Sequence, residues 1–178
     1  MLIDIIVRHS TIINMEKLPG DYIAGFVDGE GCFYINFRRD VRHDRKNKPI
    51  YFYWDIGFAI VLRADDQEIL EIIKNTLNCG KINLNKRGGV RFDVTDAQDL
   101  ASKIVPFFET NTLRAKKRQD FILWKEALHI LQRNKQTKTP NKRGFEKIEW
   151  RRGDIKRLKE IKEEMANYKS KRPAWKWL

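Results

Sequence analysis

The chain has few cysteines, few histidines and no long run of apolar residues. Its two cysteines, Cys32 and Cys79, are too few for a disulfide framework, and its three histidines are scattered without the spacing of zinc ligands. No apolar stretch is long enough to span a membrane, and residues 1–16 lack the small-residue cleavage site of a secretory signal. We therefore expect reduced thiols in an intracellular protein that is not secreted, located in the cytoplasm of a prokaryote or in an organelle.

Positive charge is what the chain has in excess. Lys and Arg number 36 against 24 Asp and Glu, which gives a formal net charge of +12 and a pI near 9.8. Such an excess is typical of proteins that bind a polyanion, with nucleic acid as the leading candidate and an anionic membrane surface as the rival. The 178 residues, with an ordinary apolar content, are enough for one domain with a core.

The hydrophobic pattern changes period several times along the chain. Helical spacing predicts helices at residues 18–28, 65–77, 96–105, 115–133 and from 154 onwards, the third of them ending near Pro106. Alternating residues predict two antiparallel hairpins between the first three helices, at 32–60 and 78–96. Paired strands between helices predict an α+β fold whose antiparallel sheet has one apolar face under helices and one polar face in water.

The stretch YIAGFVDGEG, residues 22–31, ends a predicted helix with two carboxylates, Asp28 and Glu30, each followed by glycine. The C-terminal end of a helix is its negative end, so carboxylates there are repelled unless a cation, such as a divalent metal ion, compensates. Each glycine inside a helix costs about 1 kcal/mol relative to alanine, which is understandable where another backbone approaches closely. Taken alone, these residues fit an ordinary turn and packing against the chain's own core at least as well.

This stretch resembles the motif of the LAGLIDADG homing endonucleases, in which acid-Gly-acid-Gly leads into a strand of aromatic and polar residues. The order of elements from residue 18 to about 133 also resembles the αββαββα core of that family, with a curved antiparallel four-stranded sheet in each subunit. The resemblance assigns residues 17–134 to the endonuclease domain. Residues 1–16 are then an N-terminal extension, and 135–178 a basic linker and extra C-terminal helix belonging to the same single domain.

The resemblance also implies an active site. Glu30 matches the catalytic acid of the family, which together with the carbonyl of Gly29 is expected to bind a divalent cation, Mg²⁺ or another. Lys116 matches the active-site lysine at the head of a later helix, although from the sequence alone it is an ordinary solvated charge. Arg63 and Gln67 are further catalytic candidates in a stretch that departs from the family pattern.

A single copy of the motif implies, by the same resemblance, a homodimer whose motif helices pack side by side on a two-fold axis. Ala24 and Gly25 are then expected at the dimer interface. Asp28 is expected to support the helix end or this interface rather than the chemistry. The implied function is a site-specific DNA endonuclease that makes a metal-dependent double-strand break with short 3′ overhangs.

The polar face of the predicted sheet is the expected contact with double-stranded DNA, because antiparallel strands fit the major groove. The side chains assigned to it are Tyr34, Asn36, Arg38, Asp40, Arg42, Tyr53, Asp55, Asn83, Asn85, Arg87, Arg91 and Asp93. Each of them taken singly is nearly as well explained as a solvated strand residue, whereas the face as a whole is a stronger prediction. A homodimer implies a long, roughly palindromic site read as two half-sites.

Two other functions remain open at this point. A protein of the same fold can act as an intron RNA-splicing maturase, or as a DNA- or RNA-binding protein without nuclease activity, and intron RNA is then a partner. A basic membrane-surface protein is the remote alternative, supported only by the charge and by the tail PAWKW, and no membrane partner is expected.

Overall fold

The computed structural model describes residues 17–41, 43–44, 46–48, 50–84, 88–134 and 150–167. Its helices and strands follow one another as α1 (Gly20–Glu30), β1 (Gly31–Val41), β2 (Ile50–Arg63), α2 (Gln67–Leu77), β3 (Lys81–Leu84), β4 (Gly89–Val94), α3 (Ala97–Asp99), α4 (Val105–Thr110), α5 (Lys117–Arg133) and α6 (Arg152–Asn167). A 3₁₀ turn, Ala64–Asp66, precedes α2, and a π-helical turn, Leu100–Ile104, joins α3 to α4. This order confirms the predicted αββαββα core with an additional C-terminal helix.

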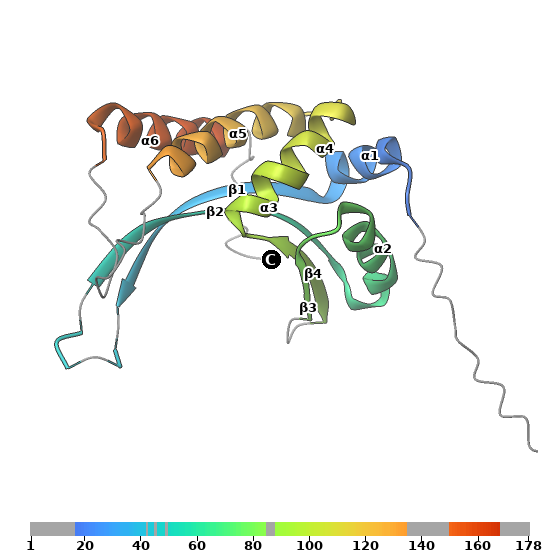
Figure 1. Cartoon of the computed structure of the whole chain (residues 1–178). Helices are drawn as coiled ribbons and strands as arrows, with labels where there is room; N and C mark the ends of the chain where they lie inside the picture. Colours follow the sequence, from blue (N-terminus) through green and yellow to red (C-terminus); the bar gives the residue numbers. More distant parts are fainter. Residues whose placement is uncertain are drawn as a thin grey trace, which may run out of the picture.

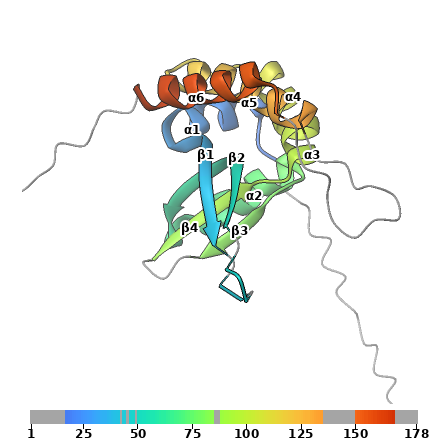
Figure 2. The same cartoon turned by 90° about the vertical axis from the view of Figure 1, so that its left-hand side faces the viewer.

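The four strands form one antiparallel sheet in the order β1-β2-β4-β3. The sheet curves under a layer of helices, and its opposite face is open (Figure 1). The long strand β2 pairs with β1 from Ile50 to Ile60 but with β4 only from Phe58 to Arg63. Its first half therefore projects with β1 as an arm, which is also visible below the helices in the view turned by 90° (Figure 2). The predicted α+β class, with one helix-covered face, is confirmed.

Aromatic side chains fix the helix layer to the sheet. The ring of Phe33 on β1 lies 5.1 Å from that of Phe58 on β2, 5.6 Å from Phe108 on α4 and 5.2 Å from Trp124 on α5, measured between centroids. All four side chains are at most 2% exposed. Burial of each such side chain stabilises the fold by about 1.5–3 kcal/mol, so α5 is held firmly over the start of β1, next to α1.

The last helix, α6, packs on α5. Its buried side chains, Leu158, Ile161 and Met165, recur at helical spacing as the sequence predicts. Arg157 forms a two-pronged contact with Glu126 of α5, at 2.7 and 2.8 Å. This helix therefore belongs to the same packed layer as α5.

The helix predicted to end near Pro106 continues to Thr110, so this boundary is wrong. The preceding turn is widened, because the N–H of Val105 bonds to the carbonyl of Leu100 five residues back. Pro106 then lies in the first turn of α4, a position that tolerates a residue without an N–H. Single widened turns of this kind occur as bulges within α-helices.

Both cysteines are free thiols, and Cys79 is buried. Burial is the main cause that raises the pKa of the Cys79 thiol to about 11. Across the described part of the chain, no helix combines the length and the apolar character needed to cross a bilayer.

Candidate active site and nucleic-acid interface

The motif helix α1 runs two residues further than predicted and includes Gly29 and Glu30 in its last turn. Its C-terminal cap is Gly31, where an added Cβ would lie 2.4 Å from the Val27 side chain and 2.7 Å from the Val27 carbonyl oxygen. Glycine is therefore required for the sharp passage from helix to strand. Glu30 is exposed at the negative end of the helix, and the last turn carries no basic residue to offset its charge.

Asp28 ties this helix end to the segment that leads into α5. Its Oδ2 accepts hydrogen bonds from the backbone N–H groups of Arg114, at 2.8 Å, and Ala115, at 3.2 Å. Its other oxygen, Oδ1, is buried and has no hydrogen-bond partner among the described residues. Asp28 was predicted to support either the helix end or a subunit interface, and these contacts are of the first kind.

Lys116 follows directly after the two residues that Asp28 holds. It is exposed at the N-terminal cap of α5, where its carbonyl accepts from the N–H of Gln119 at 3.1 Å. Glu30 is two residues beyond Asp28 in the motif helix. We call the two hydrogen bonds from Arg114 and Ala115 to Asp28 the clamp. The clamp thus brings the regions of the two predicted catalytic side chains together, although they are far apart in the sequence.

The other two catalytic candidates have partners of their own. Arg63, at the end of β2, forms an exposed ion pair with Asp65 at 2.9 Å. The side-chain amide of Gln67 donates to Glu71 at 2.7 Å and lines a shallow groove between α2 and β3. Among the described residues neither side chain is hydrogen-bonded to Glu30, and their catalytic roles stay predictions.

The outward face of α1 differs from the prediction in one respect. Ala24 was assigned to an interface with a second copy, but it is 4% exposed and packs in the chain's own core, so it is not available on the surface. The exposed stripe is formed instead by Tyr22, Gly25 and Gly29, at helical spacing, together with the half-buried Phe26. At both glycines an added Cβ would meet no atom within 4 Å.

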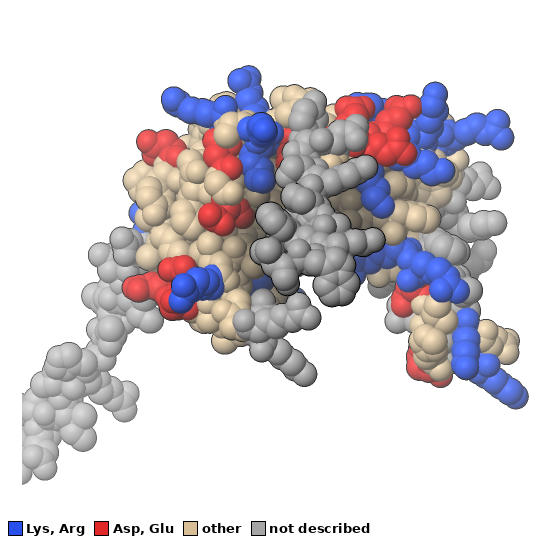
Figure 3. All heavy atoms as spheres, turned by 180° about the vertical axis from the view of Figure 1, so that it is seen from behind, with Lys and Arg blue, Asp and Glu red and all other residues tan. Residues whose placement is uncertain are grey.

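The polar face of the sheet is the open one. All its described candidates are at least partly exposed, namely Tyr34, Asn36, Arg38, Asp40, Tyr53, Asp55, Asn83, Arg91 and Asp93. The remaining three, Arg42, Asn85 and Arg87, lie outside the described residues. The molecule seen from behind shows Lys and Arg side chains over the helix layer and along the β1–β2 arm, with Asp and Glu among them (Figure 3).

Arginines and aspartates on this face are paired. Arg38 lies 2.7 Å from Asp55, and Arg91 lies 2.6 Å from Asp93. The hydroxyl of Tyr34 donates to the same Asp93 oxygen at 3.1 Å. From the sequence these residues are expected to be separate DNA contacts. The i, i+2 spacing of Arg91 and Asp93 on one strand face is the feature that could have revealed their pairing.

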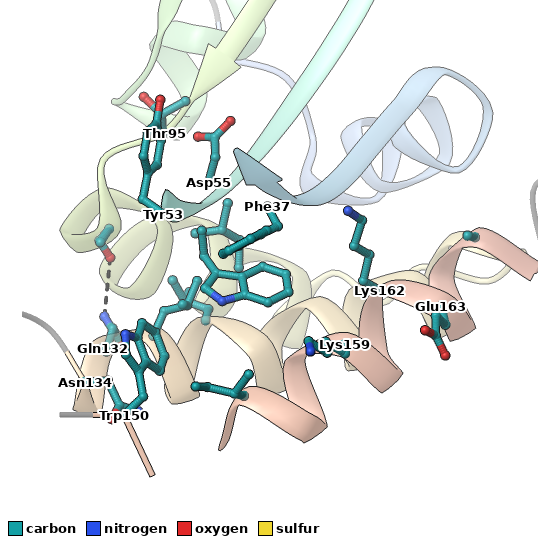
Figure 4. A pocket seen from close by; sticks show the side chains of 17 residues that line it. Phe37, Tyr53, Asp55, Thr95, Gln132, Asn134, Trp150, Lys159, Lys162 and Glu163 are labelled. Atoms are coloured by element: carbon teal, nitrogen blue, oxygen red, sulfur yellow. Dashed lines mark hydrogen bonds between the residues drawn. The ribbon is translucent and has the colours of Figure 1, made fainter. Parts of the chain in front are cut away.

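A cavity of about 1090 Å³ lies where β2 extends beyond β4 and faces α5 and α6. Figure 4 shows Phe37 and Trp150 around it, with Lys159 and Lys162 reaching towards it from α6. Tyr53 and Asp55, both predicted to contact DNA, line its sheet side. No pattern in the sequence predicts this cavity, because it results from the differing lengths of β2 and β4.

Solved structures with this fold include homing endonucleases. The crystal structure of the homing endonuclease I-TnaI is 26% identical and superposes with a TM-score of 0.66, covering 84% of this chain and 89% of that one. The I-LtrWI LAGLIDADG homing endonuclease bound to target DNA, at 22% identity and a TM-score of 0.65, covers 83% of this chain and 44% of its own. The sequence profile described as LAGLIDADG endonuclease matches residues 23–128. The chain therefore belongs to the LAGLIDADG endonuclease family.

Curated relatives are similar over part of their length. Probable intron-encoded DNA endonuclease 1 of Mycosarcoma maydis is 30% identical over 105 residues, which are 59% of this chain and 35% of the relative. Probable intron-encoded endonuclease 2 of Neurospora crassa is 31% identical over 124 residues, 67% of this chain and 26% of the relative. The chain thus corresponds to between a quarter and about a third of each.

Proposed function

We propose that this chain is a site-specific DNA endonuclease that acts as a homodimer and cuts both strands of a long, roughly palindromic site. The observation that carries the proposal is the clamp at Asp28, which joins the end of the motif helix, with Glu30 exposed, to the segment that presents Lys116. An exposed carboxylate and an exposed lysine on two segments that these hydrogen bonds join suit phosphodiester hydrolysis. Membership of the LAGLIDADG endonuclease family supports the same conclusion.

We assign the second copy of the site to a second chain, since these 178 residues carry the motif and Glu30 once. The exposed stripe of α1 suits such a partner, since its two glycines leave the helix backbone open to close approach. Tyr22 is 48% exposed and stacks on Phe26 with ring centroids 6.3 Å apart, so the stripe also offers apolar surface for burial. A two-fold axis along this stripe gives each DNA strand its own Glu30.

The residues around Glu30 fit a divalent cation. Carboxylate and carbonyl oxygens, here from Glu30 and Gly29, are the ligands that Mg²⁺ prefers. The last turn of α1 has no basic residue, and the buried Oδ1 of Asp28 lacks a hydrogen-bond partner within the described chain, so negative charge is left uncompensated. When bound, the ion would lower the pKa of a water molecule and neutralise phosphate charge.

The chain's own residues then have separate tasks. Glu30 would hold the ion, when bound, and would accept a hydrogen bond from water. Lys116 places a positive charge against the phosphoryl oxygens, where negative charge grows during hydrolysis. Asp28 keeps the two in register through backbone contacts. Cutting of each strand at its own Glu30 would give the double-strand break with short 3′ overhangs that the family resemblance implies.

The test is cleavage of duplex sites enriched by binding from a random library, in the presence and absence of Mg²⁺. The wild type is expected to linearise a plasmid carrying such a site only with the metal. Glu30→Gln removes the charge with almost no change in shape, and it is expected to bind the site but not to cut it. Asp21→Asn, at the other end of the same helix, is the matched control and should cut normally.

Full metal-dependent cleavage by Glu30→Gln would refute the assignment of the catalytic acid. If the wild type cuts no enriched duplex but binds intron RNA tightly, the maturase function replaces the nuclease. The oligomeric state is tested separately by sedimentation, with and without DNA.

A further inference from the structure

A three-residue cluster on the open face of the sheet connects strands that are not neighbours. Arg91 and Asp93 lie on β4, whose alternate residues Val90, Phe92 and Val94 are buried under the helices. Their side chains are therefore on the opposite, uncovered face. Tyr34 on β1 joins them, although β2 lies between β1 and β4.

Glycine makes this contact across β2 possible. Gly57 is the residue of β2 that pairs with Tyr34. A Cβ added to Gly57 would lie 2.4 Å from the Tyr34 hydroxyl oxygen and 2.9 Å from the carbonyl oxygen of Val94. The Tyr34 side chain thus occupies the space over Gly57, and its hydroxyl donates a hydrogen bond to Oδ1 of Asp93, at 3.1 Å.

The cluster restrains Arg91 in two ways. Nη2 of the guanidinium donates to Asp93 at 2.6 Å, and the group lies over the Tyr34 ring, 5.4 Å from its centroid. Burial, followed by the charges of Asp93 and Asp55, raises the pKa of Tyr34 to about 12, so its hydroxyl remains a donor at neutral pH. A guanidinium has five N–H donors, and the bond from Nη2 to Asp93 leaves most of them for a ligand.

The chemistry of the cluster favours a base edge over a phosphate. Asp93 offsets the charge of Arg91 at 2.6 Å and would repel a phosphate brought to the same place. A base edge is neutral, and only guanine presents two acceptors, N7 and O6, side by side in the major groove. Adenine has a donor where guanine has O6, which would face the guanidinium donors.

We propose that Arg91 reads one guanine in each half-site of the DNA, and that Tyr34 and Asp93 hold its guanidinium in the orientation for this contact. The inference rests on the proposed function and adds a base-reading residue to it. A restrained arginine loses less side-chain freedom on binding than a mobile one, which favours discrimination between bases. The pair Arg38–Asp55 is 2.7 Å apart, and among the described residues no aromatic ring lies under its guanidinium. The Arg38 side chain is 55% exposed, against 39% for Arg91.

The experiment compares base preferences at every position of an enriched site for the wild type, Arg91→Ala, Tyr34→Phe and the control Arg38→Ala. For the wild type, replacing one particular G·C pair by A·T in each half-site should weaken binding roughly 10- to 100-fold. Arg91→Ala should abolish the preference at that position and leave the others unchanged. Tyr34→Phe, which removes only the hydroxyl, should weaken the guanine preference at that position in part. Arg38→Ala should retain the guanine preference there.

The salt dependence separates base reading from a phosphate contact. Loss of a phosphate contact lowers affinity for all sequences alike and reduces the slope of log K against log salt by about 1. If Arg91→Ala gives that result with an unchanged base profile, the inference is wrong while the endonuclease stands. If the wild type binds and cuts no duplex, the proposed function fails and this inference fails with it. Circular dichroism and thermal unfolding establish that each variant is folded.

Discussion

Replacing Gly25 by leucine tests the proposed dimer, because its effects on the subunit and on assembly have opposite signs. Gly25 lies within α1, and an added Cβ would meet no atom within 4 Å in the single chain. Glycine inside a helix costs about 1 kcal/mol relative to alanine, and leucine is close to alanine on this scale. We therefore expect the free energy of unfolding of an isolated subunit to rise by roughly 0.5–1 kcal/mol.

In the homodimer the same leucine would stand between two closely packed helices. Overpacking of a filled contact costs about 1–3 kcal/mol per site, and a two-fold axis introduces two leucines at once. A loss of roughly 2–6 kcal/mol follows, and every 1.4 kcal/mol corresponds to about tenfold in the association constant. The variant is therefore expected to be a stable monomer that has lost DNA cleavage.

Sedimentation velocity measures the assembly, urea unfolding of the dissociated protein measures the subunit, and plasmid cleavage measures activity. The matched control is Gly153→Leu near the start of α6, where an added Cβ also meets no atom within 4 Å. It should leave both assembly and cleavage unchanged. If Gly25→Leu still sediments as a dimer and cuts at the wild-type rate, the exposed stripe of α1 is not the interface.

Four further predictions test single features. Asp28→Ala leaves two backbone N–H groups without their acceptor, and it should lower the free energy of unfolding by about 1–2 kcal/mol in urea titrations; a smaller effect on stability and cleavage than Asp21→Ala would contradict the clamp. Leu158→Ala empties a fully buried position between α6 and α5, and differential scanning calorimetry should show that the free energy of unfolding falls by about 2–5 kcal/mol. An unchanged stability would show that α6 contributes nothing to the core. In a Cys32→Ser variant, Cys79 should react slowly with an aromatic disulfide reagent near neutral pH and faster as the pH approaches 11, since burial raises its pKa to about 11; rapid reaction near pH 7 would contradict this. DNA affinity should fall steeply with salt in filter-binding or fluorescence titrations, and a flat dependence would exclude extensive phosphate contacts.

The fold could be predicted because the sequence is locally consistent with it. Val90, Phe92 and Val94 alternate with polar residues, and the structure buries each of the three. The errors are at boundaries, where tertiary contacts decide. Pro106 was expected to end a helix, but the widened turn before it removes the need for its N–H. The end of α1 is set by the fit of Gly31 against Val27, which no pattern of residues displays.

The candidate site was likewise predictable from the sequence only in part. Glu30 and Lys116 follow from a motif and from their places in the order of elements, which the structure keeps. The clamp that brings their regions together depends on two backbone N–H groups, at Arg114 and Ala115. Nearly every residue has such a group, so the sequence does not show which ones will bond to Asp28. Ala24 was misplaced because small residues serve equally well in a core and between helices, and only burial distinguishes the two.

The distribution of charge separates attraction to DNA from discrimination among sequences. The chain carries a net charge of +12, yet on the open face Arg38 and Arg91 are each paired with an aspartate, and Asp40 lies on the same strand as Arg38. The described residues of this face therefore nearly balance in charge, which suits base edges, since these carry no net charge. Most of the excess of Lys and Arg lies in residues outside the described part of the chain, chiefly 135–149 and 168–178. Over the helix layer and the β1–β2 arm, Figure 3 shows Lys and Arg mixed with Asp and Glu. Because salt screens phosphate contacts and not the pattern of base edges, added salt should weaken binding to all sites alike and leave their ranking unchanged.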